Sequence, residues 1–510
     1  MGPHRDCGRV SNLKSPVHDQ TQTRRFPTTS HSGELSSLYS SRALADQAFS
    51  RAAGAPLIGG NSVRLLIDGA QNYPAWLAAI ASARDHIHFE SYIIHEDRVG
   101  IEFADALIAK AQQGVRVRLI YDWMGGLFKT SRRFWNRLRA AGVEVRCYNP
   151  PTFGSPLSWL ARDHRKMLSV DGEVGFIAGL CVGNAWVGEP DKHIEPWRDT
   201  GVEVHGPAVA DIERAFAEVW AIMGEPIPDP EPAGTMPVPL AGDVSLRVVA
   251  TMPSTAGLFR LDQLISAMAR KRLWLTDAYY AGTTTYVEAI RAAARDGVDI
   301  RLLLPNATDI PLLRPLSRSG YRPLLEAGVR IFEWNGTMIH AKTSVADGRW
   351  ARVGSTNLNV ASWLGNCELD AVIENEEFAR QMEEQYLSDL GHATEVVLVG
   401  ARRRVRVPGE PPHRVPLTSG GGKAGRAAAG AMRIGNAVGA AFTKHRLLDP
   451  LEARLLLEAG LLLVGIAVLL YFFPKVASYP LMVILAWMGI SLIYRAGKLF
   501  RKLRSGRRSQ

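Results

Sequence analysis

The feature that most restricts the fold of this chain is an internal duplication built around one short motif. The pattern His-x-Lys-x-x-x-x-Asp occurs twice, and its two copies are His164, Lys166, Asp171 and His340, Lys342, Asp347. Three fixed residue types at one spacing are rarely repeated by chance within a single chain. We therefore expect two halves with the same local structure around each motif.

The same order of strands and helices surrounds both motifs. In the first half, strands are expected at Val63–Asp68, His86–Ile94, Val115–Tyr121 and Val143–Tyr148. Helices are expected between them at Trp76–Ala83, at Ile101–Gln113 and in a segment ending near Ala141. In the second half, the matching strands are expected at Val244–Ala250, Leu273–Tyr280, Val298–Leu304 and Val329–Trp334. The matching helices are Leu258–Ala269, Tyr286–Arg295 and a helix reaching Glu326. This alternation predicts an α/β fold with a largely parallel, buried sheet in each half. Duplicated halves usually pack with pseudo-two-fold symmetry, which would bring both motifs to one shared site.

Side chains alternate along a strand, so the His and Lys of each motif lie on the same face. Each motif therefore presents one imidazole and one ammonium group toward a common point. The Asp falls on the opposite face, at the end of the strand. We expect it to set the following turn, at Asp171-Gly172 and Asp347-Gly348, rather than to touch a substrate. A lone His would more often be a satisfied core residue, but the repetition argues against that alternative here.

Two histidines and two lysines suit phosphodiester chemistry. With an ordinary pKa near 6.5, one imidazole can be neutral and nucleophilic while the other is protonated and acidic. A covalent phosphohistidine divides one difficult displacement into two easier ones. The lysines would stabilise charge on the non-bridging oxygens. The sequence predicts no cofactor and no metal.

Charge and cysteine content narrow the class further. The net charge of +10 favours anionic partners, either phospholipid surfaces or nucleic acid, without choosing between them. The four cysteines show neither a disulfide framework nor a zinc pattern and are expected to be isolated reduced thiols. The N-terminal 38 residues have no apolar core, so we expect a disordered segment rather than a secretory signal.

Two apolar runs near the C-terminus predict a membrane hairpin. Leu455–Phe473 and Val476–Tyr494 each approach the roughly 20 residues that cross a bilayer. A buried hairpin in a soluble core is the alternative. Basic residues follow the second run within Arg495–Arg508 and also precede the first, while the connector carries only Lys475. Cationic flanks stay on the cytoplasmic side, so both ends of the hairpin are expected there.

These features define the expected domain boundaries. They are 1–38 for the disordered segment, 39–225 for the first repeat, 226–242 for a Pro-rich linker, 243–399 for the second repeat, 400–450 for a linker that is either an interfacial helix or a flexible spacer, and 451–510 for the hairpin and basic tail.

Over about residues 40–400, the chain resembles the phospholipase D superfamily, whose hallmark is the doubled motif. It is most similar there to bacterial cardiolipin synthases, through the segments FESYIIHEDRVG, WRDTGVEVHGPAV and GSTNLNVASWLGNCELD. The resemblance implies two phospholipase D-like α/β repeats with one site at their interface. It also implies a membrane-bound phosphatidyltransferase that makes cardiolipin and glycerol from two phosphatidylglycerol molecules through a phosphohistidine.

The resemblance also implies roles for individual residues. His164 would attack phosphorus, and His340 would protonate the leaving glycerol and then deprotonate the incoming alcohol. The phosphate-binding residues expected from it are Lys166, Lys342, Asn357 and Ser355. The catalytic set implied by the two motifs and their flanks is His164, Lys166, Asp171, Asp199, His340, Lys342, Asp347 and Glu368.

Two carboxylates outside the motifs have positions that the family uses to orient the histidines. We expect Glu368 beside His164 and Asp199 beside His340. One position departs from the family pattern, because Cys181 stands where the first repeat usually carries Asn. A thiol is a weak hydrogen-bond donor, which puts symmetrical holding of the phosphate in question.

The expected partners are phosphatidylglycerol, other anionic phospholipids and the bilayer, with no nucleic acid. The expected location is the bacterial inner (cell) membrane, with the catalytic domain on the cytoplasmic side. The alternatives are a phospholipase D-type hydrolase that uses water as the acceptor, a nuclease of the same superfamily, and an inactive membrane scaffold. Neither the acceptor alcohol nor the oligomeric state follows from the sequence.

Overall fold

The computed structural model describes residues 44–152, 160–228, 239–310, 313–398 and 414–416, with scattered residues between Phe472 and Ile490. The chain divides into two compact units, Met1–Gln47 and Ala48–Gln510, and both repeats lie in the second. Within the described ranges, no helix is long and apolar enough to cross a membrane. The predicted segments that lie wholly or largely outside these ranges are 1–38, the centre of 226–242, 400–450, Leu455–Phe473 and Val476–Tyr494.

Both repeats contribute strands to one continuous sheet. The strands of the first repeat are β1 (Ile58–Ile67), β2 (His86–Ser91), β3 (Arg116–Asp122), β4 (Glu144–Tyr148), β5 (Lys166–Val170), β6 (Val174–Ala178) and β7 (Thr200–His205). Those of the second are β8 (Val244–Thr251), β9 (Arg272–Thr276), β10 (Asp299–Pro305), β11 (Arg330–Trp334), β12 (Thr343–Ala346), β13 (Trp350–Gly354) and β14 (Glu368–Glu374). Two further strands, β15 (Ala393–Val397) and β16 (Arg414–Pro416), extend the second edge.

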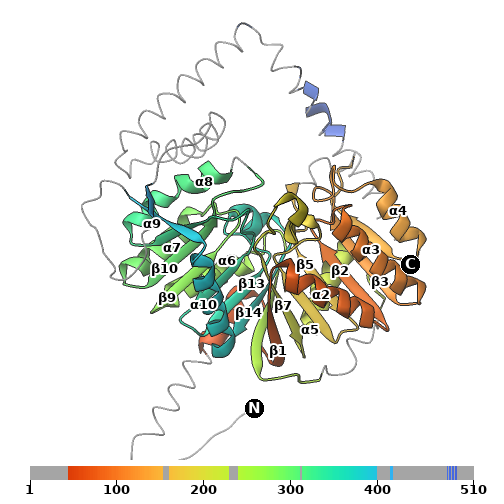
Figure 1. Cartoon of the computed structure of the whole chain (residues 1–510), viewed down its shortest axis with the longest axis horizontal. Coiled ribbons are helices and arrows are strands. Elements are labelled where there is room, and N and C mark those ends of the chain that lie inside the picture. The colour runs from red at the N-terminus through yellow and green to blue at the C-terminus, as the bar shows by residue number, and fades with distance from the viewer. Residues whose placement is uncertain are drawn as a thin grey trace, which may run out of the picture. The chain divides into compact units, whose positions relative to one another are not determined.

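The order of the strands in space confirms the duplication. The first repeat runs β1-β7-β6-β5-β2-β3-β4, and the second runs β8-β14-β13-β12-β9-β10-β11. Each position in one series therefore has its counterpart in the other. The two series join where β1 pairs with β8 in the antiparallel sense. Figure 1 shows β1, β7, β13 and β14 between the helices of the two repeats.

The prediction of largely parallel sheets was wrong. In the first repeat β2, β3 and β4 are parallel, whereas β5, β6, β7 and β1 pair antiparallel, and the second repeat repeats this division. The motif strand turns back at Asp171-Gly172, and a tight turn of this kind can join only antiparallel neighbours. The helical crossovers between β2, β3 and β4 produce the parallel part.

Helices cover both faces of each half of the sheet. In the first repeat they are α2 (Asp68–Ser82), α3 (Arg98–Gln112), α4 (Arg132–Ala140) and α5 (Val209–Ile222). In the second they are α6 (Gly257–Met268), α7 (Thr284–Arg295), α8 (Leu313–Ser319), α9 (Tyr321–Glu326) and α10 (Glu376–Leu390). The single helix predicted to reach Glu326 is thus two short ones, α8 and α9. Side-chain caps begin several of these helices, as at Asp97 for α3 and Ser131 for α4.

One hydrophobic core is shared between the repeats. It combines α5 residues such as Phe216 with α10 residues such as Met382 and with strands from both halves. Two further cores, one in each repeat, pack the remaining helices against the outer faces. Because the shared core spans the boundary, the repeats are held as one body with the motif strands near its centre.

Candidate active site

The histidine of the first motif is bonded to the second repeat through its backbone. His164 N–H donates to the Cys367 carbonyl at 2.9 Å, and Cys367 N–H donates to the Arg162 carbonyl at 2.8 Å. Cys367 directly precedes Glu368 in the chain. This short bridge therefore fixes the first residue of β14 beside the histidine of the other repeat.

The second motif repeats this arrangement in reverse. His340 N–H donates to the Arg198 carbonyl at 2.7 Å, and Arg198 N–H donates to the Met338 carbonyl at 2.9 Å. Arg198 directly precedes Asp199. Each histidine thus receives a carboxylate from the opposite repeat, which is the geometry expected for one shared site with pseudo-two-fold symmetry.

The side chains complete both pairs. His164 Nδ1 lies 2.9 Å from Glu368 Oε2, and His340 Nδ1 lies 2.8 Å from Asp199 Oδ2. Both carboxylates are fully buried, and the histidines are 8% and 4% exposed. The expected neighbours are therefore in place. With Nδ1 held by a carboxylate, Nε2 is the atom that each ring offers to a substrate.

The two carboxylates are themselves fixed by hydrogen bonds, but in different ways. Glu368 accepts from the Ser355 hydroxyl at 2.6 Å and from the Asn366 amide at 3.1 Å. Asp199 accepts from Trp186 Nε1 at 2.9 Å and from the backbone N–H of Thr200 at 2.8 Å. The orientation of each imidazole is therefore set by residues behind the carboxylate as well as by the carboxylate itself.

Gly179 explains part of this difference. A Cβ on Gly179 would overlap Asp199 Oδ1, so the chain needs glycine where the aspartate approaches. In the second repeat the corresponding position is Ser355, whose hydroxyl bonds Glu368. We interpret the pairs Gly179 with Asp199 and Ser355 with Glu368 as two local solutions to the same packing problem.

The two motif lysines are buried beside the histidines. Lys166 and Lys342 are 1% and 0% exposed, and each ammonium donates to the backbone carbonyl of its own motif histidine. Lys166 Nζ lies 5.2 Å from the ring centroid of Tyr92, and Lys342 Nζ lies 5.6 Å from that of Tyr279. Burial lowers the pKa of Lys342 to about 8. Two cations thus border the space in front of the imidazoles.

Burial also lowers the pKa values of the two motif histidines. It lowers the pKa of His164 to about 4, against the opposing pull of Glu368. Burial and Lys342 likewise hold the pKa of His340 well below its ordinary value, against Asp199. For Glu368 and Asp199, burial alone would raise the pKa, but the neighbouring histidine and lysine keep it lowered. We therefore treat the site without substrate as two neutral imidazoles donating to two ionised carboxylates.

The motif aspartates do not join this site, although the doubled motif placed them in the catalytic set. Asp171 lies beyond the far end of β5 and accepts backbone N–H bonds from Arg84, Asp85 and His86 at 2.8–2.9 Å. Asp347 accepts the equivalent bonds at 2.8–2.9 Å from the three residues that lead into β9. Both residues have a positive φ, 54° and 52°. Each aspartate thus holds the turn after its motif strand, and among the described residues neither one bonds a motif histidine.

The predicted phosphate-binding residues differ in their surroundings. Asn357 is 2% exposed, and its side-chain oxygen has no hydrogen-bond partner among the described residues. The Ser355 hydroxyl is already committed to Glu368, which makes it a support for the carboxylate. Cys181 is 1% exposed, and burial raises its pKa although Lys166 and Lys342 oppose this. A neutral thiol therefore stands where the second repeat has Asn357.

Sequence reasoning missed the aromatic residues around the imidazoles. The ring of Tyr92 lies 5.0 Å from that of His164, and Tyr279 and Trp197 lie 5.7 and 5.6 Å from His340 between ring centroids. Trp186 reaches Asp199, as described above. Tyr92 and Tyr279 follow equivalent strands in the two halves, so a closer comparison of the repeats would have indicated them.

A second buried cluster contains His86, His88 and Glu213, with ligand-type atoms all within 4.8 Å of one another. His86 Nε2 lies 2.7 Å from Glu213 Oε1, and the Ser169 hydroxyl donates to the same oxygen at 2.9 Å. The guanidinium of Arg118 lies 3.4 Å from His88 Nε2. Because a permanent cation already borders the cluster, we interpret it as part of the hydrogen-bonded core rather than as a metal site.

A duplicated α/β sheet with two His-Lys pairs facing one site across the repeat boundary defines a member of the phospholipase D superfamily. Comparison with known proteins agrees. The family described as "Cardiolipin synthase, PLD-like domain" matches residues 76–220 and 261–390. The chain belongs to this family, and it is a phospholipid phosphatidyltransferase of the phospholipase D superfamily.

Several curated relatives are similar over most of the repeats. The cardiolipin synthase of Alkalihalophilus pseudofirmus is 32% identical over 347 residues, which are 67% of this chain and 68% of that protein. That of Geobacillus kaustophilus is 32% identical over 337 residues, 65% of this chain and 66% of that protein. The crystal structure of phosphatidylserine synthase from Haemophilus influenzae has a TM-score of 0.55 at 14% identity and covers 68% of this chain and 91% of that one, which shows a shared fold.

Proposed function

We propose that this chain joins two phosphatidylglycerol molecules into cardiolipin and releases one glycerol. The observation that carries the proposal is the reciprocal pairing of His164 with Glu368 and of His340 with Asp199, next to two buried lysines. The names of the relatives support the substrate class.

In the first step, His164 Nε2 attacks the phosphorus of one phosphatidylglycerol. The P–N bond forms as the P–O bond to glycerol breaks, and His340 Nε2 supplies the proton that the leaving oxygen needs. Glu368 stabilises the positive charge that develops on the His164 ring. Lys166 and Lys342 hold the non-bridging oxygens, where negative charge concentrates in the transition state.

His340 must be protonated for this step, yet burial and Lys342 hold its pKa below the ordinary value. The substrate phosphate carries a negative charge into this space. An anion close to the imidazole favours the imidazolium, so binding raises the pKa of His340. Binding of the substrate therefore both protonates His340 and brings the leaving group to it.

In the second step, a hydroxyl of another phosphatidylglycerol attacks the phosphohistidine. His340 Nε2 takes the proton of that hydroxyl as the new P–O bond forms, and the P–N bond to His164 breaks. Both histidines then have their starting charge, and the sum of the two steps is cardiolipin plus glycerol. If water attacks instead, the product is phosphatidic acid and the enzyme is a hydrolase.

We also propose that the two apolar runs, Leu455–Phe473 and Val476–Tyr494, attach the enzyme to the cell membrane. The basic residues on both flanks support an orientation with both ends of the hairpin and the repeats on the cytoplasmic side. Accessibility of tags at residues 44 and 510 to protease, in intact cells and in inverted vesicles, tests this orientation. Digestion of both tags only in inverted vesicles is expected.

The function itself is tested with the full chain in membranes supplied with labelled phosphatidylglycerol. We expect labelled cardiolipin and one glycerol for each cardiolipin formed. His164→Ala and His340→Ala are expected to remove the product. Phosphatidic acid as the main product would establish the hydrolase, and absence of any product from wild type would reject both functions.

A further inference from the structure

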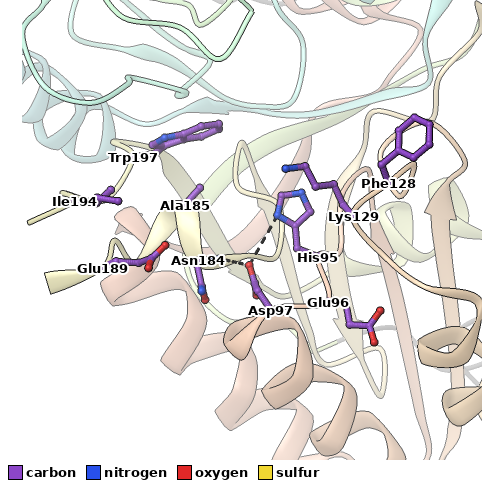
Figure 2. Close-up of a pocket in the computed structure, with 10 residues that line it drawn as sticks. All are labelled: His95, Glu96, Asp97, Phe128, Lys129, Asn184, Ala185, Glu189, Ile194 and Trp197. Carbon is purple, nitrogen blue, oxygen red and sulfur yellow. Dashed lines mark hydrogen bonds and ion pairs between the residues drawn. The ribbon is translucent and has the colours of Figure 1, made fainter. Parts of the chain in front are cut away.

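A pocket of about 480 Å³ opens in the first repeat (Figure 2). Its wall includes Trp197, whose ring centroid lies 5.6 Å from that of His340. Through Trp197, the pocket therefore adjoins the residue that handles the proton of the alcohol. The alcohol part of a substrate would be expected on this side of the site.

The polar wall of the pocket is held in place by backbone bonds. His95 N–H donates to the Val182 carbonyl at 3.0 Å, which ties the segment after β2 to the segment after β6. Asp97 accepts from the backbone N–H of Asn184 at 2.7 Å and caps α3 through Gly100 N–H at 3.0 Å. Burial lowers the pKa of His95. A neutral His95 ring can donate to or accept from a hydroxyl group.

Lys129 supplies the one ammonium among the residues that line the pocket, beside the carboxylates of Glu96, Asp97 and Glu189. The carboxylate of Glu189 pairs with Lys192, and Glu96 accepts the backbone N–H of Ser131 at 2.8 Å. No ion pair is formed by the exposed ammonium of Lys129 with any of the described residues. Figure 2 shows its end directed toward His95 and the space in front of Trp197. An ammonium without an ion-pair partner can contact an anionic group of a ligand.

Two large apolar side chains on the rim of the pocket are exposed. Phe128 is 95% exposed and is held at a φ of 60°, and Ile194 is 45% exposed. A large aromatic side chain presented to solvent indicates a surface that an apolar partner covers. Acyl chains or the membrane surface would provide one. The rim therefore favours a lipid over a small soluble alcohol.

We propose that this pocket binds the headgroup of the acceptor phospholipid, with a hydroxyl directed to His340 and the acceptor's own phosphate against Lys129. This inference rests on the proposed function. The glycerol that leaves in the first step occupies the polyol part of the same pocket, but its phosphate stays on the transferred group. Lys129 therefore acts only on the acceptor, in the second step.

The restriction of Lys129 to the second step can be measured with the full-length Lys129→Gln variant. Two rates are compared in mixed micelles of phosphatidylglycerol: formation of cardiolipin, and exchange of labelled free glycerol into phosphatidylglycerol. Exchange uses the same phosphohistidine and the same His340 but an acceptor without phosphate. We expect cardiolipin formation to fall roughly tenfold, as for loss of one charge-assisted hydrogen bond, with exchange within about twofold of wild type.

Lys271→Gln is the matched control, because Lys271 is an exposed lysine at the far end of β9 from His340. It is expected to leave both rates unchanged. Equal rates of cardiolipin formation in wild type and Lys129→Gln would overturn the pocket assignment while leaving the proposed function intact. A parallel fall of both rates would also overturn it, because a contact with the acceptor phosphate cannot slow exchange. Absence of both reactions in wild type would instead reject the proposed function.

Discussion

Glu368 in the second repeat holds His164 in the first, with 2.9 Å between Oε2 and Nδ1. The pair formed by Asp199 and His340 is its mirror across the repeat boundary, at 2.8 Å. Neither repeat contains a complete pair. The duplication therefore produces one site with two similar halves, and the fold must be assembled before either histidine is oriented.

Glu368→Gln is expected to lower the rate of cardiolipin formation by about 10²- to 10⁴-fold, because an amide neither fixes the same tautomer nor stabilises the charged ring. Glu368→Asp keeps the charge and should recover part of the rate, which a purely structural role would not produce. Initial rates on labelled phosphatidylglycerol, with thermal unfolding to verify the fold, provide the measurement. A Gln variant within threefold of wild type would contradict the orienting role.

Asp171→Ala is expected to lower stability rather than chemistry. The substitution leaves three backbone N–H groups without their acceptor and places Ala at a positive φ, so we expect a loss of about 1–3 kcal/mol in the free energy of unfolding. The rate per folded molecule should change less than threefold. Denaturation curves combined with activity at low temperature separate the two effects. A large loss of rate in a fully folded variant would return Asp171 to the catalytic set.

Arg198 of the first repeat forms a buried two-point ion pair with Asp389 of α10, at 2.9 Å for both bonds. Asp389→Ala leaves the guanidinium buried without this partner, which costs about 3–5 kcal/mol. Arg64→Ala is the control, because the Arg64 side chain is 60% exposed and its pair with Glu203 should contribute less than about 1 kcal/mol. Comparable losses in the two variants would contradict the assignment of Arg198 as a link between the repeats.

Substrate binding is expected to take up a proton. Burial lowers the pKa of His340 below its ordinary value, so the ring is neutral at pH 6.5, whereas Lys342, with a pKa of about 8, is already charged. A bound phosphate anion raises the pKa of the imidazole, and about one proton should enter the site. Titration calorimetry with a phosphonate analogue of phosphatidylglycerol, in buffers of different ionisation enthalpy, measures this uptake.

Two variants identify the side chain that takes up the proton in the calorimetry experiment. His340→Ala should bind the analogue without proton uptake, whereas His164→Ala should retain it. If wild type shows no uptake at pH 6.5, or if uptake persists in His340→Ala, then His340 is not the group that the phosphate charges.

The sequence was sufficient for the repeat structure and for the pairing across it. The doubled motif and the shared order of strands and helices follow from comparing the two halves of one chain, whereas the positions of Asp199 and Glu368 were implied by the resemblance to the phospholipase D superfamily. The strand directions did not follow. Periodicity detects a strand but carries no information on the direction of its neighbour, and only the turn at Asp171-Gly172 indicated an antiparallel return.

The residues that donate hydrogen bonds to the two carboxylates also could not be predicted from the sequence. Trp186 reaches Asp199 and Ser355 reaches Glu368 only because the chain folds back over β7 and β14. Tyr92 and Tyr279 were detectable in principle from their matching positions. The pocket around Lys129 depends on loops that differ between the repeats, so no comparison of the halves would have revealed it.

The central claim is that the two histidines belong to one site and have unequal roles. The most direct measurement is covalent trapping in the His340→Ala variant with a labelled nitrophenyl ester of phosphatidic acid, whose leaving group needs no proton from His340 in the first step, followed by mass spectrometry of the labelled peptide. Without its base for the second step, the enzyme should accumulate an acid-labile phosphatidyl group on His164, and His164→Ala should retain no label. Label on His340, or label that persists in His164→Ala, would contradict this account.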